Sequence, residues 1–372
     1  MKTASLSSAL SLLILSLEAA SSNAFVMPSA SSVRTELAAS ASKESGGSDN
    51  SVMTAREARV TGPLSTLAAA SALTGASLLT EPEAANADAY SPDFDTSVRT
   101  FFPGAVPNSV VNLRVTDKLT KRGYRPLNTI MGASVCSDEI DSTALSLLQQ
   151  LQRSITLQKD GGVFNLGGLG GIPFVGKSGF GAFLSHVPSQ GRVVILYGPH
   201  VGISNEGVVG KVERVGQDSP STSCGAGIGA YKAIKAGGRG PNDKFDYQEE
   251  FIIDELTPKL QTLLEQQKNS GAVNGFVNAN TAIAAVTCNM FDVVNDVMEA
   301  QLEAAWSKKG FWDKITEVTL LGGIIVNRGH GSGLVGGDDY FQPLQFKSVN
   351  AEGEVDMWDQ VFGDLKRKTP GV

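Results

Sequence analysis

The sequence is poor in several residue types that would mark out large classes of protein. It has only three cysteines, an odd number too small for a disulfide framework, so at least one thiol is free, metal-bound or joined to another chain. Lys and Arg total 31 against 38 Asp and Glu, which gives a formal net charge of −7. Basic runs interleaved with aromatic residues are missing as well. We therefore expect no binding of nucleic acid.

Long apolar runs are also scarce. The main candidate, at 67–79, is too short and too rich in Ala, Ser and Gly for a stable transmembrane helix. We therefore expect no stable membrane insertion of the mature protein. What the chain does contain is 41 glycines and a hydrophobic share of 41% over 372 residues. This length supports a real core, and clustered glycines favour an α/β protein with many tight turns.

The N-terminal region is typical of targeting signals. Residues 1–24 predict a secretory signal peptide, because Lys2 precedes an apolar core at 9–17 and small residues follow it. Residues 25–87 are rich in Ser and Ala, as plastid transit peptides are. The junction Asn23–Val26 resembles the Ala-Phe cleavage motif of diatom and related secondary-plastid leaders.

The apolar run at 67–79 is followed by a small-x-small cleavage site at Ala85–Ala87. Together these signals predict a three-step route through the ER and the plastid to the thylakoid lumen. Stroma and pyrenoid are the alternative destinations, and 67–79 is alternatively a short helix of the mature protein. Nothing in residues 88–372 is typical of a long linker, so we expect one domain there.

Hydrophobic periodicity predicts alternating strands and helices in this domain. A strand at 128–135 precedes a helix at 142–155, for which Asp141 and Ser142 are suitable caps. Further strands are predicted at 193–197, 212–216 and 318–326, and further helices at 224–235, 249–264 and 282–306. This order predicts an α/β fold, in which functional residues gather at the carboxyl ends of strands.

Three potential metal ligands occupy such positions. Cys136 follows the strand at 128–135, His200 follows the strand at 193–197, and Cys224 opens a glycine-rich stretch. Two thiolates and an imidazole are the ligands of a catalytic zinc site that keeps a fourth position open. Asp138, two residues after Cys136, would face the same way in an extended segment. It could accept a hydrogen bond from a water on the metal, or occupy the fourth position itself.

Each of these residues also has a plain structural interpretation, as a buried small residue or a satisfied core histidine. Cys288 falls inside a predicted helix and is expected to be a structural thiol. His186 and His330 are either proton shuttles or loop residues without a role.

A phosphate-binding loop is a competing hypothesis. Gly171–Ser178 has the literal spacing Gly-x4-Gly-Lys-Ser. The loop contains a proline and the bulky Phe174, however, and the residues after Ser178 make a poor helix start. We therefore expect a tight glycine-rich bend here, lined by Phe174, Phe180 and Phe183.

Several motifs, in this order, resemble the theta-class carbonic anhydrases, the family of the limiting-CO2-inducible B protein of algae. The resemblance covers 119–346, and its motifs are Cys136–Ile140, Leu166–Phe174, Gly179–Phe183, Tyr197–Ile203, Ser223–Ala226 and Asp339–Phe341. It implies a mainly parallel sheet flanked by helices, similar to beta-class carbonic anhydrase, and a homodimer. It also implies that residues 88–372 form a catalytic zinc domain.

The resemblance further implies the chemistry. Zn2+ would be held by Cys136, His200 and Cys224, with Asp138 as the acidic partner, and the reaction would be the reversible hydration of CO2 to bicarbonate. The three phenylalanines of the glycine-rich bend would form an apolar wall for CO2.

One position departs from the beta-class pattern, in which an Arg follows the Asp by two residues. That place is Ile140 here, so the partner of Asp138 must come from elsewhere; Arg214 and Arg192 are the candidates. A non-catalytic bicarbonate sensor or scaffold with a structural zinc is the alternative function.

Overall fold

A computed structural model describes residues 92–156, 163–237, 246–269, 279–329, 338–365 and 367. The predicted signal and targeting segments lie outside the described residues. All described residues fall in one compact unit. None of the helices in the described ranges combines the length and the hydrophobicity needed to cross a membrane.

One mixed sheet forms the centre of this unit. Its strands run in the order β1-β9-β8-β4-β2-β3, with β5 also paired to β8 and β10 to β9. The strands are β1 Val106–Pro107, β2 Thr129–Ser134, β3 Phe164–Asn165, β4 Gly191–Tyr197, β5 His200–Ile203, β8 Ile315–Arg328, β9 Tyr340–Asn350 and β10 Gly353–Asp356. The pairs among β3, β2, β4, β5 and β8 are parallel, whereas the pairs of β9 are antiparallel. The predicted mainly parallel α/β fold is therefore confirmed.

Alternating side chains bury both faces of the central strands. In β4, Val193, Ile195 and Tyr197 belong to one apolar cluster, whereas Val194 and Leu196 belong to the other. A strand covered on both faces is continuously apolar. This explains why the strand at 193–197 could be recognised in the sequence.

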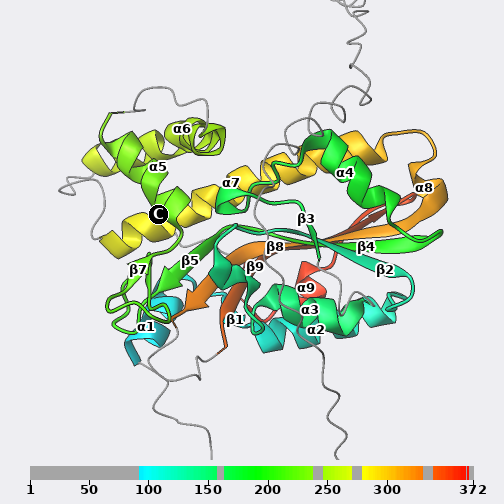
Figure 1. Cartoon of the computed structure of the whole chain (residues 1–372), viewed down its shortest axis with the longest axis horizontal. Coiled ribbons are helices and arrows are strands. Elements are labelled where there is room, and N and C mark those ends of the chain that lie inside the picture. Colours follow the sequence, from blue (N-terminus) through cyan, green and yellow to red (C-terminus); the bar gives the residue numbers. More distant parts are fainter. Residues whose placement is uncertain are drawn as a thin grey trace, which may run out of the picture. The chain divides into compact units, whose positions relative to one another are not determined.

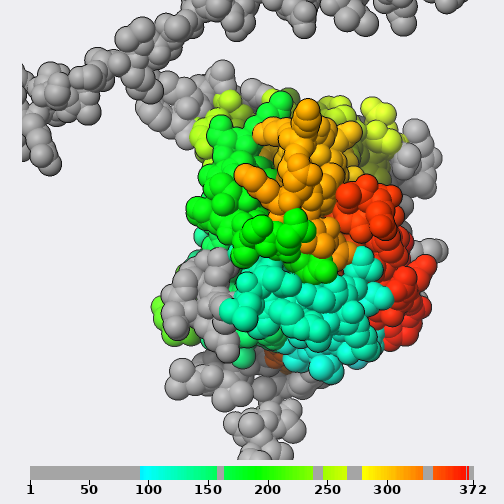
Figure 2. Space-filling view, turned by 90° about the vertical axis from the view of Figure 1, so that its right-hand side faces the viewer, coloured from blue at the N-terminus to red at the C-terminus, as the bar shows by residue number. Residues whose placement is uncertain are grey.

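Helices cover the two faces (Figure 1). The first cluster is formed with α1, α4, α5, α6 and α7, and the second with α2, α3 and α9. The helices are α1 Pro92–Phe101, α2 Asn108–Lys121, α3 Leu147–Ile155, α4 Gly176–Ser185, α5 Gly225–Lys235, α6 Tyr247–Asn269, α7 Ala279–Trp306, α8 Phe311–Lys314 and α9 Trp358–Phe362. Seen from the side, the red residues of the segment 338–365 lie beside α2, where Arg114 contacts Asp364 at 2.6 Å (Figure 2).

The predicted helix at 142–155 begins later than expected. Residues Glu139–Ser142 form a separate 3-10 turn, η2, and α3 starts only at Leu147. The Asp138 side chain accepts from the Ile140 amide and so caps η2, while Ser146 caps α3. Two helical segments, each with its own capping residue, therefore replace the single helix that was predicted.

The segment at 171–178 differs from expectation in one respect, because α4 begins at Gly176 within it. Two backbone amides of the bend are nevertheless engaged within it. The Gly171 amide donates to Gly168 O at 3.2 Å and the Phe174 amide donates to Ile172 O at 2.9 Å. A phosphate cradle needs converging free amides, whereas these two amides close the tight bend that was predicted.

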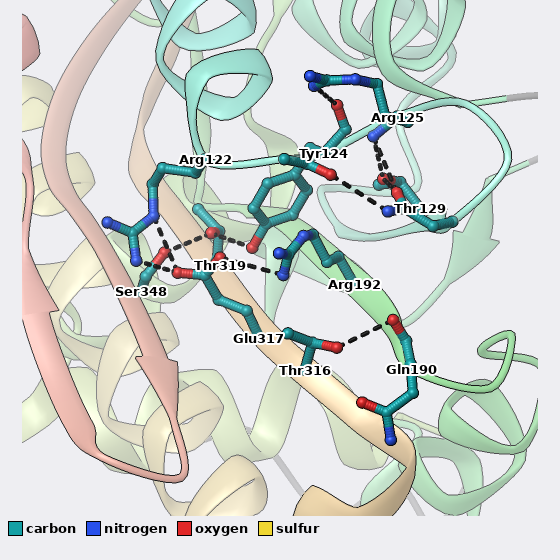
Figure 3. A network of polar contacts seen from close by, with 12 residues as sticks. Arg122, Tyr124, Arg125, Thr129, Gln190, Arg192, Thr316, Glu317, Thr319 and Ser348 are labelled. Carbon is teal, nitrogen blue, oxygen red and sulfur yellow. Dashed lines mark hydrogen bonds and ion pairs between the residues drawn. The ribbon is translucent and has the colours of Figure 1, made fainter.

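A polar network ties together the amino ends of β2, β4 and β8 (Figure 3). Glu317 is 3% exposed and accepts from Arg122 Nε at 2.9 Å. Arg192 lies 3.6 Å from the same carboxylate and stacks over the Tyr124 ring. The candidate Arg192 is therefore engaged at the end of the sheet opposite to the predicted metal ligands.

Candidate metal centre

The carboxyl ends of the parallel strands bring the three predicted ligands together. Cys136 follows β2, His200 begins β5, and Cys224 is the residue before α5. Their ligand atoms lie within 4.8 Å of one another, and the two sulfurs are 3.8 Å apart. All three side chains are buried. Cys136 and His200 are separated by 64 positions in the sequence, and His200 and Cys224 by 24. They nevertheless form one cluster, as expected for site residues of a parallel sheet.

A break between β4 and β5 places His200. Gly198 has a φ of +148°, and a Cβ at this position would lie 1.7 Å from the Gly323 carbonyl oxygen. Only glycine allows the two backbones to approach this closely. After the break the chain pairs with β8 again, so that His200 aligns with Ile325.

Polar groups surround the Nδ1 edge of the His200 ring. Asn327 Oδ1 lies at 2.8 Å, Ser223 Oγ at 3.4 Å and Asp141 Oδ2 at 3.5 Å. His200 Nε2, in contrast, is buried without a hydrogen-bond partner among the described residues. A buried nitrogen of this kind needs an explanation, and a metal ion is one.

The two thiols are electrostatically unequal. A hydrogen bond from Cys136 holds the pKa of Cys224 well below its ordinary value, and His200 acts in the same direction. The bond to Cys224, together with burial, raises the pKa of Cys136 to about 12. The cluster therefore favours one thiolate even without a metal. Thiolate and imidazole are ligands that Zn2+ prefers, so the residues present fit this ion.

Arg214 is the residue that pairs with Asp138. It follows β6 (Lys211–Val212), which forms a small two-stranded sheet with β7 (Ser221–Thr222). Its two terminal nitrogens donate to the two carboxylate oxygens, each at 2.8 Å, and its Nε donates to Ser221 Oγ at 2.8 Å. Burial opposes ionisation of Asp138, but these bonds outweigh it and lower its pKa to about 2. Asp138 Oδ2 lies 3.8 Å from His200 Nε2.

A mostly apolar hollow opens beside the cluster. Residues from α5 and α7 supply most of its lining, which consists of Pro199, His200, Cys224, Gly227, Ile228, Ile283, Val286, Thr287 and Met290. The predicted phenylalanine wall is wrong. Phe180 and Phe183 are fully buried in the core, and Phe174 packs against Phe251.

The remaining thiol and histidines stand apart from this cluster. Cys288 is buried in α7, where burial raises its pKa to about 12. The His186 ring lies edge-on to Phe164 at 5.7 Å between centroids. His330 lies outside the described residues.

Sequence reasoning missed two buried residues of the site. Asn327 contacts His200, and its amide donates to Asp141 Oδ1 at 3.1 Å. Asp141 was expected to cap a helix but is buried beside the His200 ring, and burial raises its pKa to about 7. The sequence offered one signal, which concerns Asn327: it is a polar residue that directly follows the apolar run Ile324–Val326.

Fold and site together define an α/β protein in which three potential metal ligands cluster at the carboxyl edge of a mainly parallel sheet. The family model for "limiting CO2-inducible proteins B/C beta carbonic anhydrases" matches residues 105–350. The chain belongs to this family.

Two solved structures are similar to this chain. The crystal structure of PtLCIB4, a homolog of the limiting CO2-inducible protein LCIB, is 28% identical, with a TM-score of 0.57 over 70% of this chain and 98% of that one. The crystal structure of LCIB itself is 19% identical, with a TM-score of 0.48 over 69% and 95% of the two chains. No curated protein matches the sequence.

Proposed function

We propose that this protein is a zinc-dependent carbonic anhydrase, which interconverts CO2 and bicarbonate in a plastid CO2-concentrating mechanism. The observation that carries the proposal is the buried Cys136–His200–Cys224 cluster, in which His200 Nε2 has no partner among the described residues. Membership in a family described as beta carbonic anhydrases supports it.

Cys136, His200 and Cys224 would hold the zinc. When bound, such an ion lowers the pKa of water and makes a nucleophile available near neutral pH. Asp138 stays ionised because Arg214 binds both of its oxygens. Its carboxylate can therefore accept a hydrogen bond from a water and orient that water. The apolar hollow suits CO2, which carries no net charge and needs few hydrogen bonds.

A second candidate function is a bicarbonate sensor or scaffold, in which Asp138 would close the metal site. The contacts of Asp138 favour the enzyme. Both of its oxygens are engaged by Arg214 at 2.8 Å, so ligation of a metal by Asp138 would have to displace charge-assisted hydrogen bonds.

The test is stopped-flow CO2 hydration on the full-length chain, with zinc measured on the same sample. We expect about one zinc per chain and activity that scales with it. Cys136→Ser should abolish both. The matched control is Cys288→Ser, which removes a buried thiol that is not one of the three clustered ligands and should leave both unchanged. Zinc without turnover would favour the sensor or scaffold, and no zinc would refute the metal site.

We further propose the substrates, the oligomeric state and the cellular location of the protein. The substrates are CO2 and bicarbonate, and the protein is proposed to be a homodimer, which light scattering on the purified chain tests. We also propose the thylakoid lumen as its location, since an acidic compartment pushes bicarbonate towards CO2, with stroma or pyrenoid as alternatives.

A further inference from the structure

Asn327 is buried beside His200, directly after an apolar stretch of its strand. It is 0% exposed, and His200 is 1% exposed. Ile324, Ile325 and Val326 precede it in β8. Burying an amide costs free energy unless its hydrogen bonds are made. Both ends of this amide are paired, which points to a role for its orientation.

Strand register places Asn327 next to the ring. β5 and β8 are parallel, with His200 aligned to Ile325 and Gly202 aligned to Asn327. Because side chains alternate along a strand, Asn327 lies on the same face as Ile325 and therefore on the His200 side. Asp141, from η2, covers this face and completes the chain of contacts.

The contacts fix which way the amide points. Its Nδ2 donates to Asp141 Oδ1 at 3.1 Å, and this carboxyl oxygen accepts. The amide oxygen is thereby turned towards His200 Nδ1, which lies 2.8 Å away. Since an amide oxygen cannot donate, the hydrogen of this bond must sit on Nδ1. Nε2 is then left with a free lone pair on the side of the two thiols.

We propose that Asn327, itself held by Asp141, is the positioning residue that fixes the Nδ1–H tautomer of His200 and presents Nε2 to the metal. The inference rests on the proposed zinc site. Metal-binding histidines generally donate their second ring N–H to an oxygen, which orients the ring and strengthens the bond to the metal. Here that oxygen comes from the neighbouring strand.

The test measures zinc affinity of the full-length chain by competition with a chromophoric chelator, without reference to turnover. Asn327→Ala should weaken zinc binding by roughly 10- to 100-fold. The loss of zinc affinity should be incomplete, because Ser223 Oγ and Asp141 Oδ2 remain near His200 Nδ1. The control is Thr319→Val, which removes buried hydrogen bonds from the same strand at the far end of the sheet. It should leave zinc affinity unchanged.

A charge-conserving exchange separates positioning from packing. Asn327→Asp combined with Asp141→Asn swaps the two groups, so a carboxylate accepts from Nδ1 and from the new amide. This double variant should regain most of the affinity that Asn327→Ala loses. A second measurement needs no variant: the chain has only three histidines, so 15N-labelled histidine in the zinc-loaded parent reports the His200 tautomer directly. We expect Nδ1 to be protonated.

Three results would each overturn the inference: zinc affinity unchanged in Asn327→Ala, no recovery in the exchange, or an unprotonated Nδ1. A parent that binds zinc and depends on Asn327, but hydrates no CO2, would refute the enzyme and leave the positioning role standing. A parent that binds no zinc would refute both.

Discussion

At the residue scale, Asp138 is the only carboxylate that faces the Nε2 side of His200 among the described contacts. Its pairing with Arg214 determines its charge and its direction. In a bidentate pair, the guanidinium fixes both the charge and the direction of the carboxylate. Burial alone would push the pKa of Asp138 upward, and the hydrogen bonds from Arg214 are the largest cause that lowers it.

Replacing Arg214 should therefore change the pH dependence of catalysis. In Arg214→Gln, burial remains and the hydrogen bonds from Arg214 are lost, so the pKa of Asp138 rises from about 2. The acid limb of the pH–rate profile should shift to higher pH, and the hydration rate should fall roughly 100-fold. Arg214→Lys keeps the charge but loses the two-pronged geometry, so partial recovery is expected. An unmoved acid limb, measured by stopped flow, would contradict the role given to Arg214.

The sequence identified some of these residues better than others. Cys136 and His200 follow recognisable apolar strands, so their meeting could be anticipated from the rules of parallel sheets. Arg214 could not be separated from Arg192, because the pairing with Asp138 spans 76 positions and depends on the course of the chain between β5 and α5. Asn327 was missed because a single polar residue at a strand end has many interpretations.

At the scale of secondary-structure elements, the two ends of the sheet have different tasks. The metal-type cluster lies at the carboxyl ends of β2 and β4, whereas the network around Glu317 lies at the amino ends (Figure 3). There, the Tyr124 hydroxyl and Ser348 Oγ each lie 2.6 Å from the Thr319 hydroxyl, so β8 is tied to β9 and to the segment between α2 and β2. Such a network serves stability more directly than chemistry.

Removing the charge of Glu317 should destabilise the fold without altering the site. Glu317→Gln leaves Arg122 and Arg192 without their shared carboxylate, and we expect a loss of about 3 kcal/mol in the free energy of unfolding. Zinc affinity should stay at the parent value. Chemical denaturation measures the first quantity and chelator competition the second. Glu303→Gln, at an exposed position of α7, is the control and should change neither. Weakened zinc binding in Glu317→Gln would mean that the two ends are coupled.

Periodicity predicted the long elements well and the short ones poorly. α7 and β4 were found because their apolar residues repeat over many positions. The start of α3 was misplaced because Asp138 and Ser146 cap two separate turns. The helix α4 was missed because glycines occupy three of its first six positions, which lowers helix propensity, and its buried Phe180 and Phe183 compensate through packing.

At the scale of the whole molecule, the proposed location depends on residues that precede the folded unit. A fluorescent fusion of residues 1–90 should reach the thylakoid lumen of a secondary plastid. A fusion that begins at residue 25 lacks the predicted signal peptide and should remain in the cytosol. Imaging both in such an alga tests the route, and stromal fluorescence of the first fusion would contradict the lumen assignment.

The alignment of β5 with β8 also limits how this family can change in length. His200 and Asn327 face each other only because their strands keep one register, and adding or removing a single residue turns every following side chain to the opposite face. Insertions and deletions in β8 between Gly323 and Asn327 would therefore dismantle the site while preserving all of its ligands. The connections on the surface carry no such constraint, and differences in chain length among relatives with a working centre should accumulate there.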